Sequence, residues 1–192
     1  QGLGSSFPVM NENSQAWRFI QEVNQRYGLK LTNFHELYQW SCQSSEHFWD
    51  FFFDFSSIIA DRGSSNVLKN GANLIESEWF PDSKLNFAEN FLSKRDETDA
   101  VVFWGEDQYK KSITYNELYA QVAKLSMWLR DMGVKKGDRV AGFLPNMPEA
   151  VVSMLATSSI GAIWTSCSPD FGVQGVLDRF GQVEPKAYIC VD

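Results

Sequence analysis

The stretch Gly133–Phe171 constrains the fold of this chain more than any other part of the sequence. It contains a short apolar run, Val140–Leu144, which ends in a cluster of proline and asparagine and predicts a buried strand. The next segment, Glu149–Ile160, is apolar on nearly all sides, and the Gly161 after it is typical of a helix C-terminus. A second apolar run, Ala162–Thr165, predicts another strand. A strand, a crossover helix and a strand in so short a stretch form a βαβ unit, which requires a parallel sheet with both faces covered.

Downstream, the sequence continues this alternation. It predicts a helix over Gln174–Val183, which Pro185 ends, and a last strand over Ala187–Val191. An alternating fold would place a further helix after that strand. We therefore predict the α/β class, with a Rossmann-like parallel sheet and flanking helices, incomplete in this chain, behind a helical N-terminal region.

Upstream, the runs Val101–Trp104 and Lys110–Thr114 flank the turn-forming Gly105–Asp107 and predict a β-hairpin. Thr114 followed by Glu117 is a capping-box pattern, which predicts that a helix begins here. The apolar residues of this helix recur at helical spacing and predict a core-facing stripe of Leu118, Val122, Leu125, Leu129 and Met132.

The N-terminal region predicts further helices. Apolar residues recur at helical spacing over Ala16–Tyr27, and Gly28 ends that pattern. Asn33 followed by Glu36 predicts the start of a second, short helix. The segment Ile58–Glu78 is rich in Gly, Ser and Asn and predicts a connector made mostly of loops.

The aromatic run Phe48–Phe55 has two interpretations. It could form an aromatic groove for a partner or a lipid. It could instead be a packed helix whose Asp50 and Asp54, four residues apart, share the hydrated face. Aromatic residues at helical spacing are usually core, and this favours the packed helix.

Composition and charge exclude several classes of function. The net charge of −7 argues against non-specific nucleic-acid binding and against anionic membrane surfaces, both of which need a basic footprint. The three cysteines, Cys42, Cys167 and Cys190, have no metal-type spacing, and their odd number argues against a disulfide framework. No apolar run is long enough to span a bilayer, and no signal-peptide pattern opens the chain. We therefore expect a cytoplasmic protein.

Several strings in the sequence resemble a known enzyme family. GDRV, LPN, PEAVV and IGA, all within residues 137–162, resemble the early core of the adenylate-forming acyl-CoA synthetases. The strings NQRYGL at 24–29 and CSPDFGVQGVLDRFGQ at 167–182 resemble the acetoacetyl-CoA synthetase branch of that family. The resemblance extends from Ala16 to Asp192 and is to the N-terminal part of such an enzyme.

This resemblance implies a two-step activation of a carboxylate by an acid–thiol ligase. Acetoacetate and ATP with Mg²⁺ would give acetoacetyl-adenylate and pyrophosphate, and coenzyme A would then displace AMP. It also implies two domains: residues 1–78 as the helical N-terminal region of the acetyl-CoA synthetase type, and residues 79–192 as the first part of the large AMP-forming domain. The family's phosphate-binding loop and its adenylation lysine are absent from these 192 residues, so this chain alone is expected to be inactive.

Open parallel sheets bind ligands beyond the carboxyl ends of their strands, and that rule selects three places here. Pro145–Pro148 is a poor anion site, because Pro148 has no N–H group and Glu149 already supplies a negative charge. Asp192 follows the last predicted strand. The third place, Ser166–Phe171, is a polar break after the second strand of the βαβ unit.

Within that break, the resemblance places Ser168, Pro169 and Asp170 on the path of coenzyme A, although the family usually has an aromatic and two small residues there. The alternative is that Ser168 or Asp170 caps the helix that follows.

No catalytic or metal-binding residue is predicted. Thr157–Ser159 resembles a hydroxyl-rich phosphate loop but ends an apolar helix, and no Walker or dinucleotide-binding glycine motif occurs. His35 and His47 have no partner at metal-ligand spacing.

Two other functions remain open. One is an acetyl- or propionyl-type acyl-CoA synthetase. The other is a free-standing Rossmann-like binding module without ligase activity. We also expect the fragment to self-associate through the exposed edge of its sheet.

Overall fold

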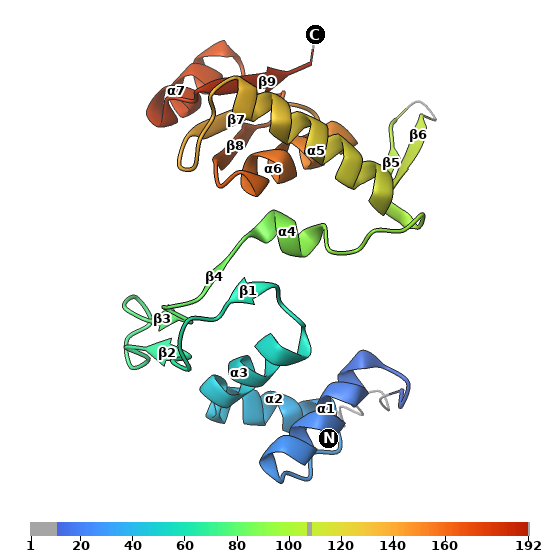
Figure 1. The fold of residues 1–192 in the computed structure, drawn as a ribbon, viewed down its shortest axis with the longest axis vertical. Helices are drawn as coiled ribbons and strands as arrows, with labels where there is room; N and C mark the ends of the chain where they lie inside the picture. The colour runs from blue at the N-terminus through green and yellow to red at the C-terminus, as the bar shows by residue number, and fades with distance from the viewer. Residues whose placement is uncertain (1–10, 107–108, 192) are drawn as a thin grey trace, which may run out of the picture. The chain divides into compact units, whose positions relative to one another are not determined.

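The computed structural model describes residues 11–106 and 109–191 (Figure 1). Asp107 of the predicted turn and Asp192, one of the three candidate places, lie outside the described residues. The chain forms two compact units, Gln1–Lys84 and Leu85–Asp192, which are described separately below. No helix among the described residues is long and apolar enough to cross a membrane.

The first unit contains the three predicted helices, α1 (Gln15–Tyr27), α2 (Phe34–Gln43) and α3 (Ser45–Phe55). As predicted, α1 ends at Gly28, whose φ of 67° is left-handed. Asn33 caps α2 by accepting a hydrogen bond from the Glu36 amide at 3.0 Å. Local capping chemistry therefore sets where these helices begin and end.

Aromatic packing holds these helices together, and Phe48–Phe55 lies in a packed helix, as the favoured interpretation predicted; an apolar hollow remains beside it, lined by Phe19, Phe48, Phe52 and Phe55 among others. Phe51 of α3 is buried against Phe19 of α1, with ring centroids 5.0 Å apart in an edge-to-face arrangement. Such pairs add about 0.5–1.5 kcal/mol to the burial of the rings themselves. Trp49 and Phe52 of the same helix remain 43% and 38% exposed, so the cluster is not fully covered.

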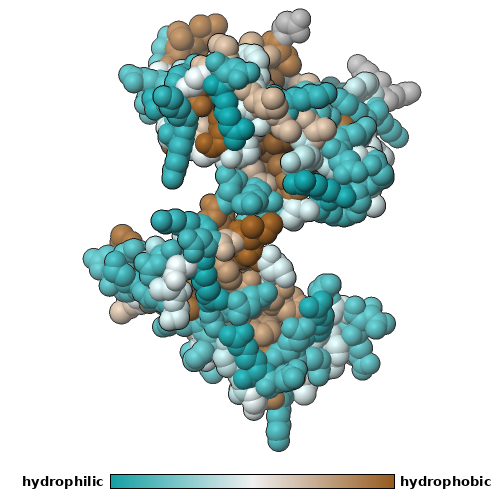
Figure 2. Space-filling model, viewed as in Figure 1, coloured by the Kyte–Doolittle hydropathy of each residue, from teal (hydrophilic) through white to brown (hydrophobic). Residues whose placement is uncertain are grey.

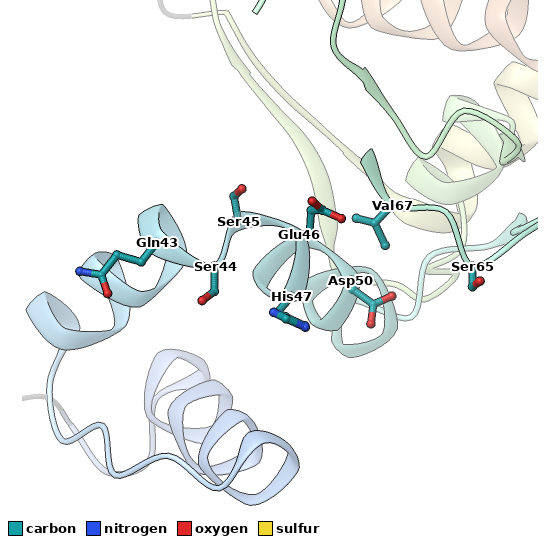
Figure 3. A pocket seen from close by; sticks show the side chains of 8 residues that line it. All are labelled: Gln43, Ser44, Ser45, Glu46, His47, Asp50, Ser65 and Val67. Atoms are coloured by element: carbon teal, nitrogen blue, oxygen red, sulfur yellow. The ribbon is translucent and has the colours of Figure 1, made fainter. Parts of the chain in front are cut away.

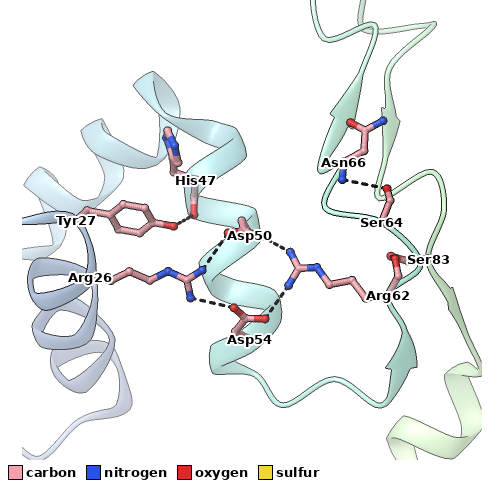
Figure 4. Close-up of polar contacts among 9 residues, drawn as sticks. All are labelled: Arg26, Tyr27, His47, Asp50, Asp54, Arg62, Ser64, Asn66 and Ser83. Atoms are coloured by element: carbon pink, nitrogen blue, oxygen red, sulfur yellow. Dashed lines mark hydrogen bonds and ion pairs between the residues drawn. The ribbon is translucent and has the colours of Figure 1, made fainter.

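The two aspartates of α3 lie on its polar face, between two arginines (Figure 4). Arg26 of α1 and Arg62 of the connector each pair with both Asp50 and Asp54. The Arg62–Asp54 contact is 2.7 Å, with side chains 30% and 45% exposed. At this exposure each pair contributes well under 1 kcal/mol, but the closed ring ties α1 and the connector to α3.

The connector after α3 contains only two-residue strands, in line with the predicted loop-rich segment. They are β1 (Ala60–Asp61), β2 (Leu68–Lys69), β3 (Glu78–Trp79) and β4 (Lys84–Leu85). β2 and β3 pair antiparallel, and β1 pairs with β4.

The second unit begins with a short helix and the predicted hairpin. Helix α4 (Phe87–Phe91) precedes β5 (Asp99–Trp104) and β6 (Lys110–Thr114), which pair antiparallel. Thr114 and Glu117 form the predicted capping box at the start of α5 (Tyr115–Asp131).

The predicted core stripe of α5 is correct up to Leu129. Met132 is 60% exposed, because the helix ends at Asp131 and the chain turns through Gly133.

The predicted βαβ unit forms the centre of the second unit. The strands β7 (Arg139–Phe143), β8 (Ile163–Cys167) and β9 (Ala187–Cys190) make a parallel sheet in the order β8-β7-β9. The fold is therefore mixed α/β. β8 runs two residues beyond the predicted Thr165, so Ser166 and Cys167 belong to the strand and not to the polar break.

Helices cover both faces of this sheet. Helix α6 (Pro148–Ser159) packs on α5 and on one face, where Val140 lies in a core with Leu155. Helix α7 (Val173–Val183) covers the other face, where Phe180 packs on Ala141.

The GDRV string has a structural role. The Asp138 carboxylate accepts hydrogen bonds from the Lys135 amide at 2.7 Å and from the Lys186 ammonium at 3.0 Å. The Arg139 guanidinium donates to the carbonyl oxygens of Val183 at 2.6 Å and Glu184 at 3.0 Å, which closes the C-terminal end of α7. Asp138 and Arg139 therefore hold the start of β7 against the segment Val183–Lys186, which connects α7 to β9.

Candidate functional site

A pocket of about 310 Å³ lies where β7 and β8 end. The loop after β7, the first turn of α6 and the end of β8 form its walls, and the residues that line it are Leu144–Asn146, Ala150, Trp164 and Ser166–Pro169. Two of the three places selected from the sequence thus meet at one pocket, as the rule for parallel sheets requires.

Ser168 and Pro169 line this pocket, whereas Asp170 is not among its lining residues and is hydrogen-bonded to Ser168. The Ser168 hydroxyl donates to the Asp170 carboxylate at 2.8 Å and accepts from the Asp170 amide at 3.4 Å. Neither residue caps α7, whose N-cap is Gly172 with no side-chain hydrogen bond. The capping alternative is therefore wrong, because these two side chains bond to each other and the chain runs on before the helix begins.

The pocket wall is electrically neutral. Its lining residues are apolar or carry amide, hydroxyl and thiol groups, and none is Lys, Arg, Asp or Glu. At the start of α6, an ion pair joins Lys111 of β6 to Glu149 at 3.0 Å. Partial burial is the largest single effect on Glu149 and opposes its ionisation. The Lys111 hydrogen bond, a backbone hydrogen bond and the charge of Lys111 together outweigh it, so the pKa of that carboxyl lies below its ordinary value. Lys111 is therefore paired with a carboxylate, and neither residue of the pair lines the pocket.

The hydroxyl-rich end of α6 is structural, as its position in the sequence suggested. Thr157 donates to the Ser153 carbonyl at 2.8 Å, and Ser158 donates to the Met154 carbonyl at 2.8 Å. These hydroxyls are used within the helix, so they do not form a phosphate loop.

A second hollow, of about 560 Å³, lies in the first unit at the start of α3 (Figure 3). Glu46, His47 and Asp50 line it together with neutral residues. The His47 ring packs against Tyr27 at 5.4 Å, and its carbonyl accepts from the Tyr27 hydroxyl at 3.1 Å. Among the described residues, no three His, Cys, Asp or Glu side chains are grouped so that they could hold a metal ion. Two carboxylates line this hollow and no Lys or Arg side chain does, so it is unsuitable for a phosphate.

Sequence reasoning did not identify Trp164 as a wall of the site. It was predicted only as part of an apolar strand. The sequence did contain one signal for a close contact in this region, the glycine at position 142 inside a buried strand. Such a glycine often marks a place where another group approaches the backbone closely.

Comparison with known proteins agrees with the family resemblance. A family model described as AMP-binding enzyme matches residues 88–192. The chain is 43% identical to the acetoacetyl-coenzyme A synthetase of Rhizobium meliloti over 94% of its own length and 45% identical to the acetoacetyl-CoA synthetase of Rattus norvegicus over 96%. It spans only 28% of the length of each.

A solved structure of the acetoacetyl-CoA synthetase from Streptomyces lividans is similar to the fold described above. The match covers 94% of this chain and 28% of the Streptomyces lividans chain, with a TM-score of 0.85 and 36% identity. The family resemblance inferred from the sequence motifs is confirmed, and the chain belongs to the AMP-binding enzyme family.

Proposed function

We propose that this chain is the N-terminal portion of an ATP-dependent acyl-CoA ligase that acts on acetoacetate. The observation that carries the proposal is the identity of 43–45% to proteins named acetoacetyl-CoA synthetase across nearly the whole chain. In the first step, a carboxylate oxygen attacks the α-phosphorus of ATP and pyrophosphate leaves. In the second, the sulfur of coenzyme A attacks the acyl carbon and AMP leaves, giving acetoacetyl-CoA.

The described residues do not fit the nucleotide or its Mg²⁺. The pocket at the strand ends has no charged lining residue, and no three potential metal ligands are grouped in the part of the chain that the structure describes. Phosphates in active sites are held by cations, backbone amides or metal ions. We therefore assign ATP and Mg²⁺ to the remaining length of such a ligase, and we expect the 192 residues alone to form no adenylate.

The neutral pocket supports a role on the path of coenzyme A. Coenzyme A carries a long uncharged arm with two amides and a terminal thiol, which needs neutral hydrogen-bonding groups and apolar walls. Ser168 and Pro169 line such a pocket, and Asp170 fixes the Ser168 hydroxyl.

In the full-length protein, Ser168→Ala should raise the apparent KM for coenzyme A. Ser158→Ala is the matched control, because the Ser158 hydroxyl bonds only within α6 among the contacts described for it. An unchanged KM for coenzyme A in Ser168→Ala would remove this residue from the path.

A substrate panel tests the acyl specificity. The protein made from the complete reading frame should form a thioester with acetoacetate in preference to acetate and propionate. A preference for acetate or propionate would identify a sibling synthetase. A reading frame that stops after Asp192 would identify a free-standing binding module.

The Rossmann-like sheet, the division into two domains and the cellular location of the protein are also proposals. The three-stranded parallel sheet, with helices on both faces, supports membership in a larger Rossmann-like sheet. The division into a helical region 1–78 and a synthetase region 79–192 stays a prediction. The free thiols Cys42 and Cys190 are exposed, and this supports a reducing cytoplasmic location.

We also propose that the 192-residue chain self-associates through β9. This strand is the last in the order β8-β7-β9, so one of its edges has no partner among the described strands. Hydrophobic surface lies over α7 and β9 (Figure 2). Leu177 of α7 is 61% exposed, and Val191, which directly follows β9, is 47% exposed. Light scattering should show dimers or larger species that Val191→Lys reduces, whereas a monomer at all concentrations would contradict the proposal.

A further inference from the structure

Gly142 is in close contact with the ring of Trp164. It lies near the carboxyl end of β7, where it pairs with Ser166 of β8 and Ile189 of β9. A Cβ atom built on Gly142 would lie 2.2 Å from Cη2 and 2.4 Å from Cζ2 of Trp164. Carbon atoms in ordinary contact lie about 3.5–4.0 Å apart, so any side chain here would displace the indole by about 1 Å or more.

The reason for a glycine at this position is this contact and not the backbone. The φ of Gly142 is outside the left-handed region, and the residue sits in a regular strand. Any L-residue could adopt that conformation. The indole is therefore what excludes a side chain at position 142.

The Trp164 indole contacts both the packed core and the pocket. Trp164 pairs with Val140 and packs against the buried cluster that contains Val140 and Leu155. It also lines the pocket at the carboxyl ends of β7 and β8. Protein cores resist compression, so a displaced ring would move toward the pocket.

We propose that Gly142 is a positioning residue which, through the Trp164 ring, sets the depth of this pocket. The part of the inference that concerns a ligand rests on the proposed function. In that setting, the indole is an apolar wall for the uncharged thiol-bearing arm of coenzyme A. A ring pushed into the pocket obstructs the thiol step and leaves adenylation intact.

The kinetic test uses Gly142→Ala in the full-length protein. The apparent KM for coenzyme A should rise by about tenfold to a hundredfold, the scale expected for a misplacement of about 1 Å. Acetoacetate-dependent exchange of pyrophosphate into ATP needs no thiol and should be unchanged. Gly181→Ala is the control, because a Cβ there meets nothing within 4 Å.

A second substitution separates positioning from general damage. Phenylalanine lacks the outer indole ring to which Cη2 and Cζ2 belong, so Trp164→Phe should make room for a side chain at position 142. The double variant Gly142→Ala/Trp164→Phe should have the KM for coenzyme A of Trp164→Phe alone. A double variant with the raised KM of Gly142→Ala would overturn the proposal. So would a Gly142→Ala variant that loses as much activity in pyrophosphate exchange as in the thiol step.

Ring position can be measured without any activity. In the protein labelled with 5-fluorotryptophan, the resonance that Trp164→Phe removes belongs to Trp164. That resonance should shift in Gly142→Ala and stay in place in Gly181→Ala. An unmoved resonance refutes the positioning role. If the wild-type protein forms no acyl-CoA, the proposed function fails, and the fluorine spectrum alone decides whether Gly142 positions the ring.

Discussion

The turn between α6 and β8 gives the most quantitative prediction, for the substitution Gly161→Val. Gly161 has a φ of 73°, in the left-handed region where a Cβ is strained. Its amide donates to the Ser158 carbonyl at 3.0 Å, and the Ala162 amide donates to the Thr157 carbonyl at 3.1 Å. This is the paired hydrogen-bond arrangement that ends helices with a left-handed glycine.

The structure limits how this strain can be relieved. Leu155 and Thr157 at the end of α6 are fully buried, so the helix cannot unwind without exposing core. A Cβ on Gly161 would also lie 3.1 Å from Cγ of Lys136, but that flexible side chain can move aside. The backbone conformation therefore sets the effect, and Gly161→Val should lower the free energy of unfolding by about 1–3 kcal/mol.

Urea denaturation measures this directly. With a slope of about 2 kcal/mol per M, the midpoint should fall by about 0.5–1.5 M and the slope should not change. Hydrogen exchange of peptides from residues 148–167 assigns the loss to this unit, with protection reduced about 5- to 150-fold. Gly161→Asn should be milder than valine, because asparagine tolerates the left-handed region. A wild-type midpoint in Gly161→Val would show that residue 161 is not held in this conformation.

Three further predictions concern charges and the pocket loop. The Lys135 amide and Lys186 lower the pKa of Asp138, so its contribution to stability is full above the unfolded pKa of about 3.9 and disappears as the pH falls below that value. The difference in urea midpoint between wild type and Asp138→Asn should therefore shrink on acidification, and a constant difference would contradict this. A double-mutant cycle of Arg62→Met and Asp54→Asn should give a coupling of about 0.2–1 kcal/mol that weakens in 1 M salt. A salt-independent coupling would exclude an ion pair. Ser168→Ala should change stability by no more than about 0.5 kcal/mol, because the residue is exposed and caps no helix. A larger loss in urea denaturation would mean that the loop supports the fold.

Features governed by local chemistry could be predicted from the sequence. The caps at Asn33 and Thr114 depend on residues three positions apart, and both are present. The left-handed Gly161 follows from a buried helix that meets a strand with almost no loop.

Features governed by contacts between distant residues could not be predicted. Whether Ser168 caps α7 or bonds to Asp170 depends on where β8 ends, and that depends on its register with β7. The contact between Gly142 and Trp164 joins two strands that are far apart in the chain. Met132 continues the apolar spacing of α5, but the helix ends at Asp131. The prediction from spacing that Met132 lies in the core was therefore wrong.

The proposed function makes this chain part of a ligase that activates acetoacetate as its adenylate. Isotope exchange between pyrophosphate and ATP measures that step alone. The protein made from the complete reading frame should catalyse exchange that depends on acetoacetate, and the 192-residue chain should catalyse none. Exchange by the 192 residues alone, or a complete protein that exchanges no faster with acetoacetate than without it, would contradict the claim.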